Sequence, residues 1–402
     1  MQKQRTVLLQ EHVVQPAAQV TKKPNPSPPH VARLAVQVKS KIINRHHDSG
    51  AGNPNIGVVH CEFMEYFAFQ WHITDSCDQR CEHCYIFSEG HPHLIEMPLE
   101  KAREVIRQCE EMCRKMNRLP YFYITGGDPI LHRDFWIILS LLKEKDIPFT
   151  ILGNPFHLTD EVCRRLKDMG CQKYQLSIDG MRYTHDSIRK PGSFDTTVEK
   201  IDVLKRNGIR VAIMTTVSGT NINEIPDIID LVVEKGVNVF AFGRYCPTSE
   251  EKSTHISPEE YRDFLERIWQ KFTQHKDSGT IFNLKDHLWT LFLHEKGLFK
   301  IPEDSDPDAV YDGCHCGDCH FTIQPNGNVM ACRRFESVVG NLFRKPIHEL
   351  WTGEEMEAYR QYDKFEKCSK CELLRFCRGC PAVAYGYHRS FYSPDPQCWK
   401  QV

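Results

Sequence analysis

The chain has 402 residues, a mass of 46.8 kDa and a formal net charge of −2 at pH 7. This is more residues than usually pack around one simple hydrophobic core. The length favours about two to three domains, or one large barrel with additions. The balanced charge gives no reason to expect a nucleic-acid partner, and no apolar run approaches the ~20 residues of a membrane helix. Residues 7–9 are too short an apolar run for a secretion signal, so we expect a cytoplasmic protein.

Residues 1–62 are predicted to form a basic extension. Within residues 1–60, eight Lys and Arg residues stand against two acids, and six prolines interrupt any periodicity. A solvated tail and a docking arm for an acidic partner peptide both fit this composition.

Strand and helix patterns alternate from residue 66 onward. Strands are predicted at 66–73, 121–125, 148–152, 174–178, 211–217 and 237–242. Amphipathic helices are predicted at 99–116, 160–169, 195–207 and 222–235, and glycine follows the last three. Six such units indicate an α/β fold, a partial (βα)6 TIM-type barrel over residues 63–285. Residues at the carboxyl ends of its strands are therefore expected to carry the chemistry.

The pattern changes after one more predicted helix at 259–274. Residues 286–402 are predicted to form a bridging segment and a small cysteine-rich domain. The last 90 residues are rich in Cys, Gly and short turns, so metal would supply the cross-links that a small apolar core cannot. Twelve of the eighteen cysteines fall at 77–84 and 314–398, and without an export signal this grouping favours metal ligation over disulfides.

Cys77, Cys81 and Cys84 form a CX3CX2C motif directly after the first strand. Three thiolates can hold a cubane cluster while leaving one iron without a protein ligand, whereas tetrahedral zinc would need a fourth ligand. The motif resembles that of the radical S-adenosylmethionine (SAM) superfamily. The resemblance implies that the open iron binds SAM, whose reductive cleavage yields a radical that abstracts a substrate hydrogen. It places His83 near the adenine, where the family usually has an aromatic residue, and Tyr85 beside the cofactor.

The segment Gly126, Gly127, Asp128 and Pro129 follows the second strand. It resembles the family's Gly-Gly-Glu-Pro segment, with Asp in place of Glu. Two glycines let the backbone approach the ligand, and its carbonyls can accept from the SAM ammonium.

Later strand ends supply further candidates for the SAM pocket. By resemblance, Ser177 and Arg189 would hold the SAM carboxylate, and Arg suits this role because its planar fork pairs bidentately. Asp179 would lie near the ribose or start the next loop. Asn154 is either a contact or a turn residue, and Thr216 is expected to line the cavity.

The second cysteine group resembles a SPASM domain, the auxiliary iron–sulfur module of one radical SAM branch. The resemblance implies two auxiliary clusters and thus three 4Fe–4S clusters in all, with two zinc ribbons as the alternative. The CX2C unit at 377–380 departs from the family, which usually has three residues in that gap. One auxiliary cluster would take Cys314, Cys332, Cys380 and either Cys316 or Cys319. The other would take Cys368, Cys371, Cys377 and Cys398.

Three polar residues are the candidates for catalysis. Arg244 follows the sixth strand and either lines the cavity or makes a structural salt bridge. Lys285 and Asp286 precede the apolar run 288–293 and either reach the substrate or cap the linker. Cys246, also beyond the sixth strand, is expected to face the cavity or to pack as a buried thiol.

The resemblance implies an oxidoreductase that matures a ribosomally made precursor peptide by cross-linking, oxidation or rearrangement. An auxiliary cluster would accept the electron left after hydrogen abstraction or orient a substrate thiolate. Expected partners are the peptide, a flavodoxin- or ferredoxin-like electron donor and a separate leader-binding protein, with neither nucleic acid nor membrane. One alternative is a formylglycine-forming sulfatase maturase, although Arg333 stands where that type has an Asp base. The other is an iron–sulfur electron-transfer protein, which would need no SAM pocket.

Overall fold

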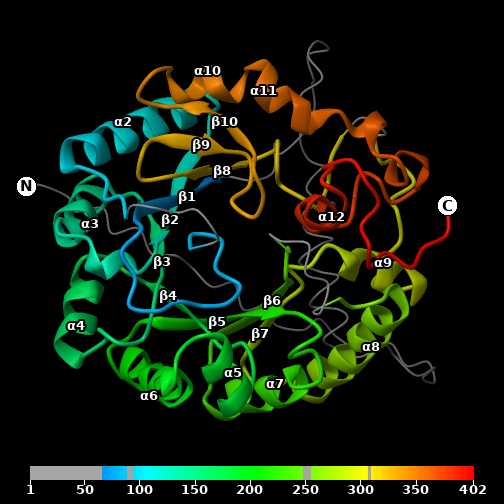
Figure 1. The fold of residues 1–402 in the computed structure, drawn as a ribbon, viewed down its shortest axis with the longest axis horizontal. Helices are drawn as coiled ribbons and strands as arrows, with labels where there is room; N and C mark the ends of the chain where they lie inside the picture. The colour runs from blue at the N-terminus through cyan, green and yellow to red at the C-terminus, as the bar shows by residue number, and fades with distance from the viewer. Residues whose placement is uncertain (1–65, 88–93, 248–254, 307–308) are drawn as a thin grey trace, which may run out of the picture.

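The computed structural model describes residues 66–87, 94–247, 255–306 and 309–402, so the predicted extension 1–62 lies outside the described residues. Ten strands form one curved sheet in the order β10-β9-β8-β1-β2-β3-β4-β5-β6-β7 (Figure 1). All pairings from β8 through β1 to β7 are parallel, and β8, β9 and β10 pair antiparallel. The bounds are β1 Tyr66–Thr74, β2 Leu119–Gly126, β3 Phe149–Leu152, β4 Lys173–Ser177, β5 Arg210–Val217, β6 Val239–Arg244, β7 Ile281–Asn283, β8 His320–Ile323, β9 Asn328–Met330 and β10 Val338–Asn341.

Helices cover the outer face of the curved sheet (Figure 1). The six predicted strands and the predicted helices are present, and the partial barrel is confirmed. An additional helix, α3, arises from an apolar run, and the short α5 follows β4. The bounds are α2 Leu99–Lys115, α3 Phe135–Glu144, α4 Asp160–Asp168, α5 Arg182–Ile188, α6 Ser193–Arg206, α7 Ile225–Glu234 and α8 Pro258–Gln274.

The alternation along each strand separates a dry outer face from a polar lumen. In β1, Phe67, Phe69 and Trp71 are fully buried beneath the outer layer, and Phe69 stacks on Phe122 of β2. The intervening Gln70 is only half-buried and faces the inside of the barrel. The core therefore lies between sheet and helices, and the opposite face of the sheet carries the more polar side chains.

The cysteine-rich segment is joined to the barrel rather than set apart from it. Strand β8 pairs with β1 and extends the barrel sheet. Its helices continue the outer layer (Figure 1): α9 Leu288–Glu295 packs on α8, and α10 Ile347–Trp351 packs on α2 and β10 with α11 Glu354–Glu357 beside it, while α12 Pro381–His388 lies toward the opening between the ends of the sheet. Among the described residues, none of the helices combines the length and apolarity needed to cross a membrane.

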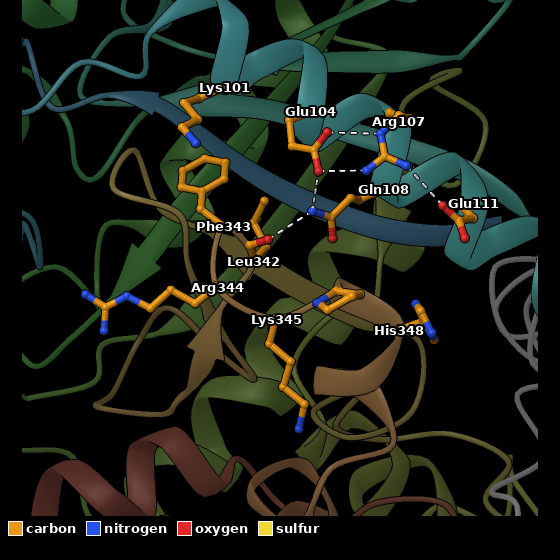
Figure 2. Close-up of a pocket in the computed structure, with 11 residues that line it drawn as sticks. Lys101, Glu104, Arg107, Gln108, Glu111, Leu342, Phe343, Arg344, Lys345 and His348 are labelled. Carbon is orange, nitrogen blue, oxygen red and sulfur yellow. Dashed lines mark hydrogen bonds and ion pairs between the residues drawn. The ribbon is translucent and has the colours of Figure 1, made fainter.

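Gln108 of α2 joins the two parts of the chain at a surface groove. Its side chain donates to the Leu342 carbonyl at 2.9 Å and accepts from the Ile347 backbone N–H at 2.8 Å. Figure 2 shows this amide between α2 and the segment after β10, with Glu104 and Arg107 beside it. The groove thus marks a packed junction between the parallel barrel and the cysteine-rich segment.

Candidate active site

The first cysteine group lies on the loop that follows β1. Cys77, Cys81 and Cys84 are half-buried free thiols that interact electrostatically with one another. Burial raises the pKa of Cys81 to about 11, although Arg189 opposes that shift. Metal binding would hold such thiols as thiolates. The three side chains therefore fit an iron–sulfur cluster with one iron left open.

This loop is fastened to the region after β4. Gln79 Nε2 donates to Ser193 Oγ at 2.9 Å, and Gln79 is almost fully buried. Lys190 Nζ donates to the Asp78 carbonyl at 3.2 Å. These contacts hold the loop between the cysteines in one conformation before any ligand binds.

Gly126 and Gly127 pack directly against the chain that leads into the cysteine loop. A Cβ on Gly126 would lie 2.1 Å from the Thr74 carbonyl oxygen, and one on Gly127 would lie 2.2 Å from that of Ser76. The Gly127 N–H also donates to the Thr74 carbonyl at 2.8 Å. The sequence predicts glycine at both positions so that a ligand can approach the backbone. The structure shows a further reason for glycine, because both residues pack closely against the neighbouring backbone. Pro129 then starts a short 3-10 turn.

Asp128 places an unpaired acceptor beside the cysteine loop. It is fully buried; Oδ1 accepts from the Asn154 N–H at 3.3 Å, while Oδ2 has no hydrogen-bond partner among the described residues. Burial, followed by the charge of Asp78, raises the pKa of Asp128 to about 7. Asn154 Nδ2 donates to Cys77 Sγ at 3.2 Å and to Asp78 Oδ1 at 2.6 Å. With His157, the two aspartates bring three ligand atoms within 4.8 Å of one another, so this corner suits a cation.

Asp179 connects the ends of β4 and β5 with the cysteine loop. Its Oδ2 accepts from Arg189 Nε at 2.6 Å and lies 3.5 Å from His83 Nε2, while Oδ1 accepts from the Thr216 N–H at 2.8 Å. Arg189 NH1 lies 3.8 Å from Cys81 Sγ. The structure thus brings the predicted pocket residues His83, Arg189 and Thr216 together around Asp179. Asp179 uses both carboxylate oxygens to organise them.

The strands of the barrel carry polar side chains but no acidic ones. Among the described residues, no strand of the sheet contains an aspartate or a glutamate. By the alternation of each strand, the polar residues on the face opposite the helices include Gln70, His72, Tyr121, Tyr123, Lys173, Gln175, Ser177, Arg210, Thr216 and His320. Such a wall favours a substrate with anionic groups.

Tyr85 and Arg333 meet between the two cysteine groups. The Arg333 guanidinium carbon lies 4.5 Å from the centre of the Tyr85 ring, and the His72 ring centre lies 6.1 Å from that ring. Arg333 Nε is buried without a hydrogen-bond partner among the described residues. The sequence predicts Tyr85 as a cofactor contact. It singles out Arg333 only because sulfatase maturases have an Asp base at that position. Its position directly after Cys332 was the available signal.

Lys285 follows β7, and its side chain is exposed. Its Nζ approaches Met214 Sδ at 3.9 Å. The surrounding protein, followed by the charge of Arg334, lowers the pKa of Lys285 to about 8. This ammonium can therefore exchange a proton near neutral pH.

Arg244 and Asp286 form a buried ion network. Arg244 Nε donates to Asp286 at 2.8 Å, and its two terminal nitrogens donate to Asp395 at 2.6 and 2.8 Å. Gln397 accepts a further bond at 2.9 Å. All four side chains are nearly inaccessible. The network joins the end of β6 to the C-terminal segment, which corresponds to the structural alternative considered for Arg244.

Four cysteines surround one cavity near the C-terminus. The cavity is lined by Leu291, Leu373, Leu374 and the predicted second auxiliary set Cys368, Cys371, Cys377 and Cys398. Cys377 Sγ accepts from the Gly379 N–H at 3.4 Å. Four thiols around a largely apolar cavity fit a four-cysteine cluster.

The other predicted auxiliary set also converges. The Cys316 backbone N–H donates to Cys314 Sγ at 3.4 Å, and burial, together with the nearby Cys314 and Cys380, raises the pKa of Cys332 to about 11. Cys319 directly precedes β8. It is one of the groups that raise the pKa of Tyr123 in β2, after burial and Tyr121. The predicted ligands are thus near one another, with more thiols than one cluster needs.

Comparison with known families supports these two centres. Residues 71–232 match the radical SAM superfamily, and residues 314–381 match SPASM, an iron–sulfur cluster-binding domain. The chain belongs to the radical SAM superfamily and carries a SPASM domain. It is a radical SAM enzyme, and it binds SAM, a 4Fe–4S cluster and auxiliary iron–sulfur clusters.

Curated relatives of this radical SAM enzyme have different named products. The AdoMet-dependent heme synthase of Nitratidesulfovibrio vulgaris is 27% identical over 339 residues, covering 82% of this chain and 90% of the relative. The mycofactocin maturase MftC of Mycolicibacterium smegmatis is 23% identical over 340 residues, covering 82% and 81%.

Solved structures share the fold. Streptococcus suis SuiB bound to S-adenosylmethionine aligns with a TM-score of 0.65 and 20% identity, covering 83% of this chain and 77% of that one. The structure of anSMEcpe with bound AdoMet aligns with a TM-score of 0.65 and 17% identity, covering 82% and 93%.

Proposed function

We propose that this radical SAM/SPASM enzyme removes hydrogen from a ribosomally made precursor peptide to form a cross-link or a related modification. The observation that carries the proposal is the Arg333 guanidinium over the Tyr85 ring, between the two cysteine groups, with a buried Nε that has no hydrogen-bond partner among the described residues. Peptide maturases are among the relatives, and SuiB was solved bound to its precursor peptide SuiA.

The residues around the first cysteine group are proposed to bind SAM. Cys77, Cys81 and Cys84 would hold one 4Fe–4S cluster, and the two C-terminal sets would hold two more. When bound, the cluster and SAM supply reductive cleavage of SAM and hence hydrogen-atom abstraction. Asp128 Oδ2 would accept from the SAM ammonium, because it is an anionic acceptor buried without a partner.

Arg189 would hold the SAM carboxylate while Asp179 fixes its orientation. The 2.6 Å contact from Arg189 Nε to Asp179 uses one side of the guanidinium and keeps the group beside Cys81. Pairing with a carboxylate at the other side would be charge-assisted. His83, Asn154, Ser177 and Thr216 would complete the pocket wall.

Lys285 is the proposed proton acceptor. Cross-link formation removes two hydrogens from the peptide, one as an atom and the other as a proton and an electron. The neutral amine of Lys285 can take that proton at Nζ, since its pKa lies at about 8. Arg244 and Asp286 would support the reaction by holding β6 against the C-terminal segment.

A porphyrin substrate is the second candidate. Relatives include AdoMet-dependent heme synthases and an Fe-coproporphyrin III synthase, and the lumen wall lacks acidic strand residues. A tetrapyrrole with carboxylate side chains would suit Arg333 and Lys285 as well as an acidic peptide would.

One assay separates the two candidates. The reduced, SAM-supplied enzyme is incubated with the peptide encoded beside its gene or with iron coproporphyrin III, and 5′-deoxyadenosine and product mass are measured. The peptide proposal predicts that only the peptide raises 5′-deoxyadenosine and that its mass falls by a hydrogen pair per cross-link. Turnover of the porphyrin alone would assign the second function instead.

A further inference from the structure

Arg333 lies between the loops of the two cysteine groups. It stands in the turn between β9 and β10, directly after Cys332, and Tyr85 directly follows Cys84. The Arg333 guanidinium carbon lies 4.5 Å from the centre of the Tyr85 ring, although the two residues are far apart in the sequence. A cation is therefore held against an aromatic face where the two loops meet.

The protein supplies no anion to pair with this cation. The Nε atom of Arg333 is buried without a hydrogen-bond partner, and the guanidinium forms no ion pair among the described residues. The strands of the sheet contribute no aspartate or glutamate. A buried cationic donor without an acceptor destabilises the fold unless a ligand supplies the acceptor.

The polar residues of β1 beside the Tyr85 ring are uncharged. Gln70 Nε2 lies 3.5 Å from the Tyr85 hydroxyl and 3.3 Å from His72 Nε2. An amide nitrogen only donates, so His72 accepts at Nε2 and is neutral. Burial, followed by the charge of Arg333, lowers the pKa of His72 well below its usual value, in agreement with that hydrogen bond. Strand β1 therefore leaves the charge of Arg333 unbalanced.

Each cysteine group already has an arginine of its own. A terminal nitrogen of Arg189 donates to Cys81 Sγ at 3.8 Å, and one of Arg334 donates to Cys380 Sγ at 3.6 Å. Among the described residues, Arg333 makes no such bond to a cysteine sulfur, although it directly follows Cys332. Its guanidinium is therefore available to an anion other than the clusters.

The shape of the guanidinium selects the kind of anion. The N–H bonds of Nε and of one terminal nitrogen run parallel along one edge of the group, and this pair matches the two oxygens of a carboxylate. The Tyr85 ring covers a face of the group and leaves its edges for such pairing. A carboxylate bound at this edge would satisfy the buried Nε.

We propose that Arg333 binds a carboxylate of the substrate through Nε and one terminal nitrogen, and thereby holds the substrate between the two cysteine groups. This inference deepens the proposed function and rests on it, because it requires a substrate at that place. In a precursor peptide the carboxylate is an Asp or Glu side chain or the C-terminus. In iron coproporphyrin III it is a propionate.

The test compares a carboxylate with its amide on matched enzymes. The full-length reconstituted enzyme is given the peptide encoded beside its gene, or peptides in which one carboxylate at a time is an amide. Arg333→Gln removes the charge, and Arg333→Lys keeps it without the fork. Arg344→Gln, at an exposed arginine after β10, is the control. Dissociation constants, KM and kcat are measured, with iron content as the check on folding.

Amidation of one particular carboxylate should weaken binding to the unaltered enzyme and to Arg344→Gln by about 10- to 100-fold, as expected for a hydrogen bond between charged groups. Arg333→Gln should bind peptide and amide equally weakly, and Arg333→Lys should recover part of the difference. The proposal would be overturned if Arg333→Gln still distinguished the acid from the amide as the unaltered enzyme does, or if no single amidation weakened binding.

Iron coproporphyrin III and its tetramethyl ester form the second arm of the test. Turnover of the porphyrin alone would refute the peptide function, whereas loss of the acid–ester difference in Arg333→Gln would still support the inference. Peptide turnover with an unchanged acid–amide difference would refute the inference and leave the peptide function standing.

A further measurement needs no variant. Phenylglyoxal modifies arginine, and mass spectrometry locates the modified residues in the unaltered loaded enzyme. Whichever compound is turned over should slow the modification of Arg333 and leave that of Arg344 unchanged, and its amide or ester should protect less. Equal modification of Arg333 with and without bound substrate would contradict the proposal even if Arg333→Gln failed to fold.

Reduction potentials test the inference without any substrate. Removing a guanidinium that pairs with a cluster lowers the potential of that cluster, because fewer hydrogen bonds and less positive charge remain beside it. Arg334→Gln should therefore lower the potential of one auxiliary cluster, and Arg333→Gln should leave all potentials nearly unchanged. A fall in Arg333→Gln as large as that in Arg334→Gln would assign Arg333 to a cluster and overturn the proposal.

Discussion

At the scale of single residues, Asp128 lowers the stability of the ligand-free protein but can contribute to ligand binding. A buried carboxylate with an unpaired oxygen destabilises the ligand-free protein, but the same oxygen can bind a cation. Asp128→Asn should raise the thermal midpoint of the metal-free chain by a few degrees at pH 8. It should also weaken SAM binding to the loaded protein by about 1.5–3 kcal/mol, the range for hydrogen bonds to charged groups.

The pH dependence of that stability difference follows from the raised pKa. The folded protein keeps Asp128 protonated up to about pH 7, whereas the unfolded chain ionises near its ordinary value of 3.8. The penalty is therefore absent below about pH 4, grows as the pH rises, and is complete above about pH 7. Thermal unfolding of both proteins from pH 4 to 8 measures it; a constant difference would refute the assignment.

Lys285 gives a pH prediction for the reaction. Only its neutral form accepts a proton, so product formation should rise as the pH passes through about 8. Lys285→Met should lower product formation by about 100-fold or more, the usual scale for a general base, and abolish that rise. Formation of 5′-deoxyadenosine in single-turnover assays is the control, because it should change little. Equal losses in both would indicate a structural role instead.

At the scale of elements, the junction between β1 and β2 positions the cysteine loop. Gly127→Ala would force a Cβ within 2.2 Å of the Ser76 carbonyl oxygen, one residue before Cys77. We expect loss of the radical SAM cluster's iron while the auxiliary iron remains. Gly170→Ala, at φ +95° with no atom within 4 Å, is the control; it should cost only about 1 kcal/mol of backbone strain. Normal cluster content in Gly127→Ala would show that the loop tolerates displacement.

The strands and helices of the barrel could be predicted because each carries a strong local signal. The alternation in β1 and the Gly that follows α4, α6 and α7 are readable without knowledge of the neighbours. The pairing of β8 with β1 could not be read, because β8 is four residues long and its partner lies about 250 positions earlier. Long-range pairing of a short strand leaves no periodic trace.

The residues of the candidate site also fall into those marked by a local sequence pattern and those that depend on long-range packing. The cysteine spacings and the Gly126–Asp128 segment are local patterns, and the structure brings them together. The position of Arg333 over Tyr85 depends on how two distant segments pack. The partners of Arg244 likewise include Asp395, 151 positions away, and this ion network could not be distinguished from a cavity contact by sequence.

At the scale of the whole molecule, the chain forms one curved sheet, and its cysteine groups lie at separate places along it. The first site lies at the carboxyl end of β1, and the C-terminal sites lie where the last segment packs against β6 and α9. A substrate held between them, as proposed above, would reach both. Replacing Cys368 and Cys371 by Ala should therefore leave SAM cleavage measurable but stop product formation, whereas normal turnover would reduce that site to a structural link.

The count of metal and sulfide in anaerobically reconstituted protein tests the central claim most directly. Three cubane clusters predict about 12 iron and about 12 sulfide per chain, falling to about eight of each when Cys77, Cys81 and Cys84 are replaced together. Zinc should stay far below one atom per chain. Stoichiometric zinc with about four iron atoms or fewer would contradict the account of the C-terminal sites, and an iron content unchanged by the triple replacement would contradict that of the first.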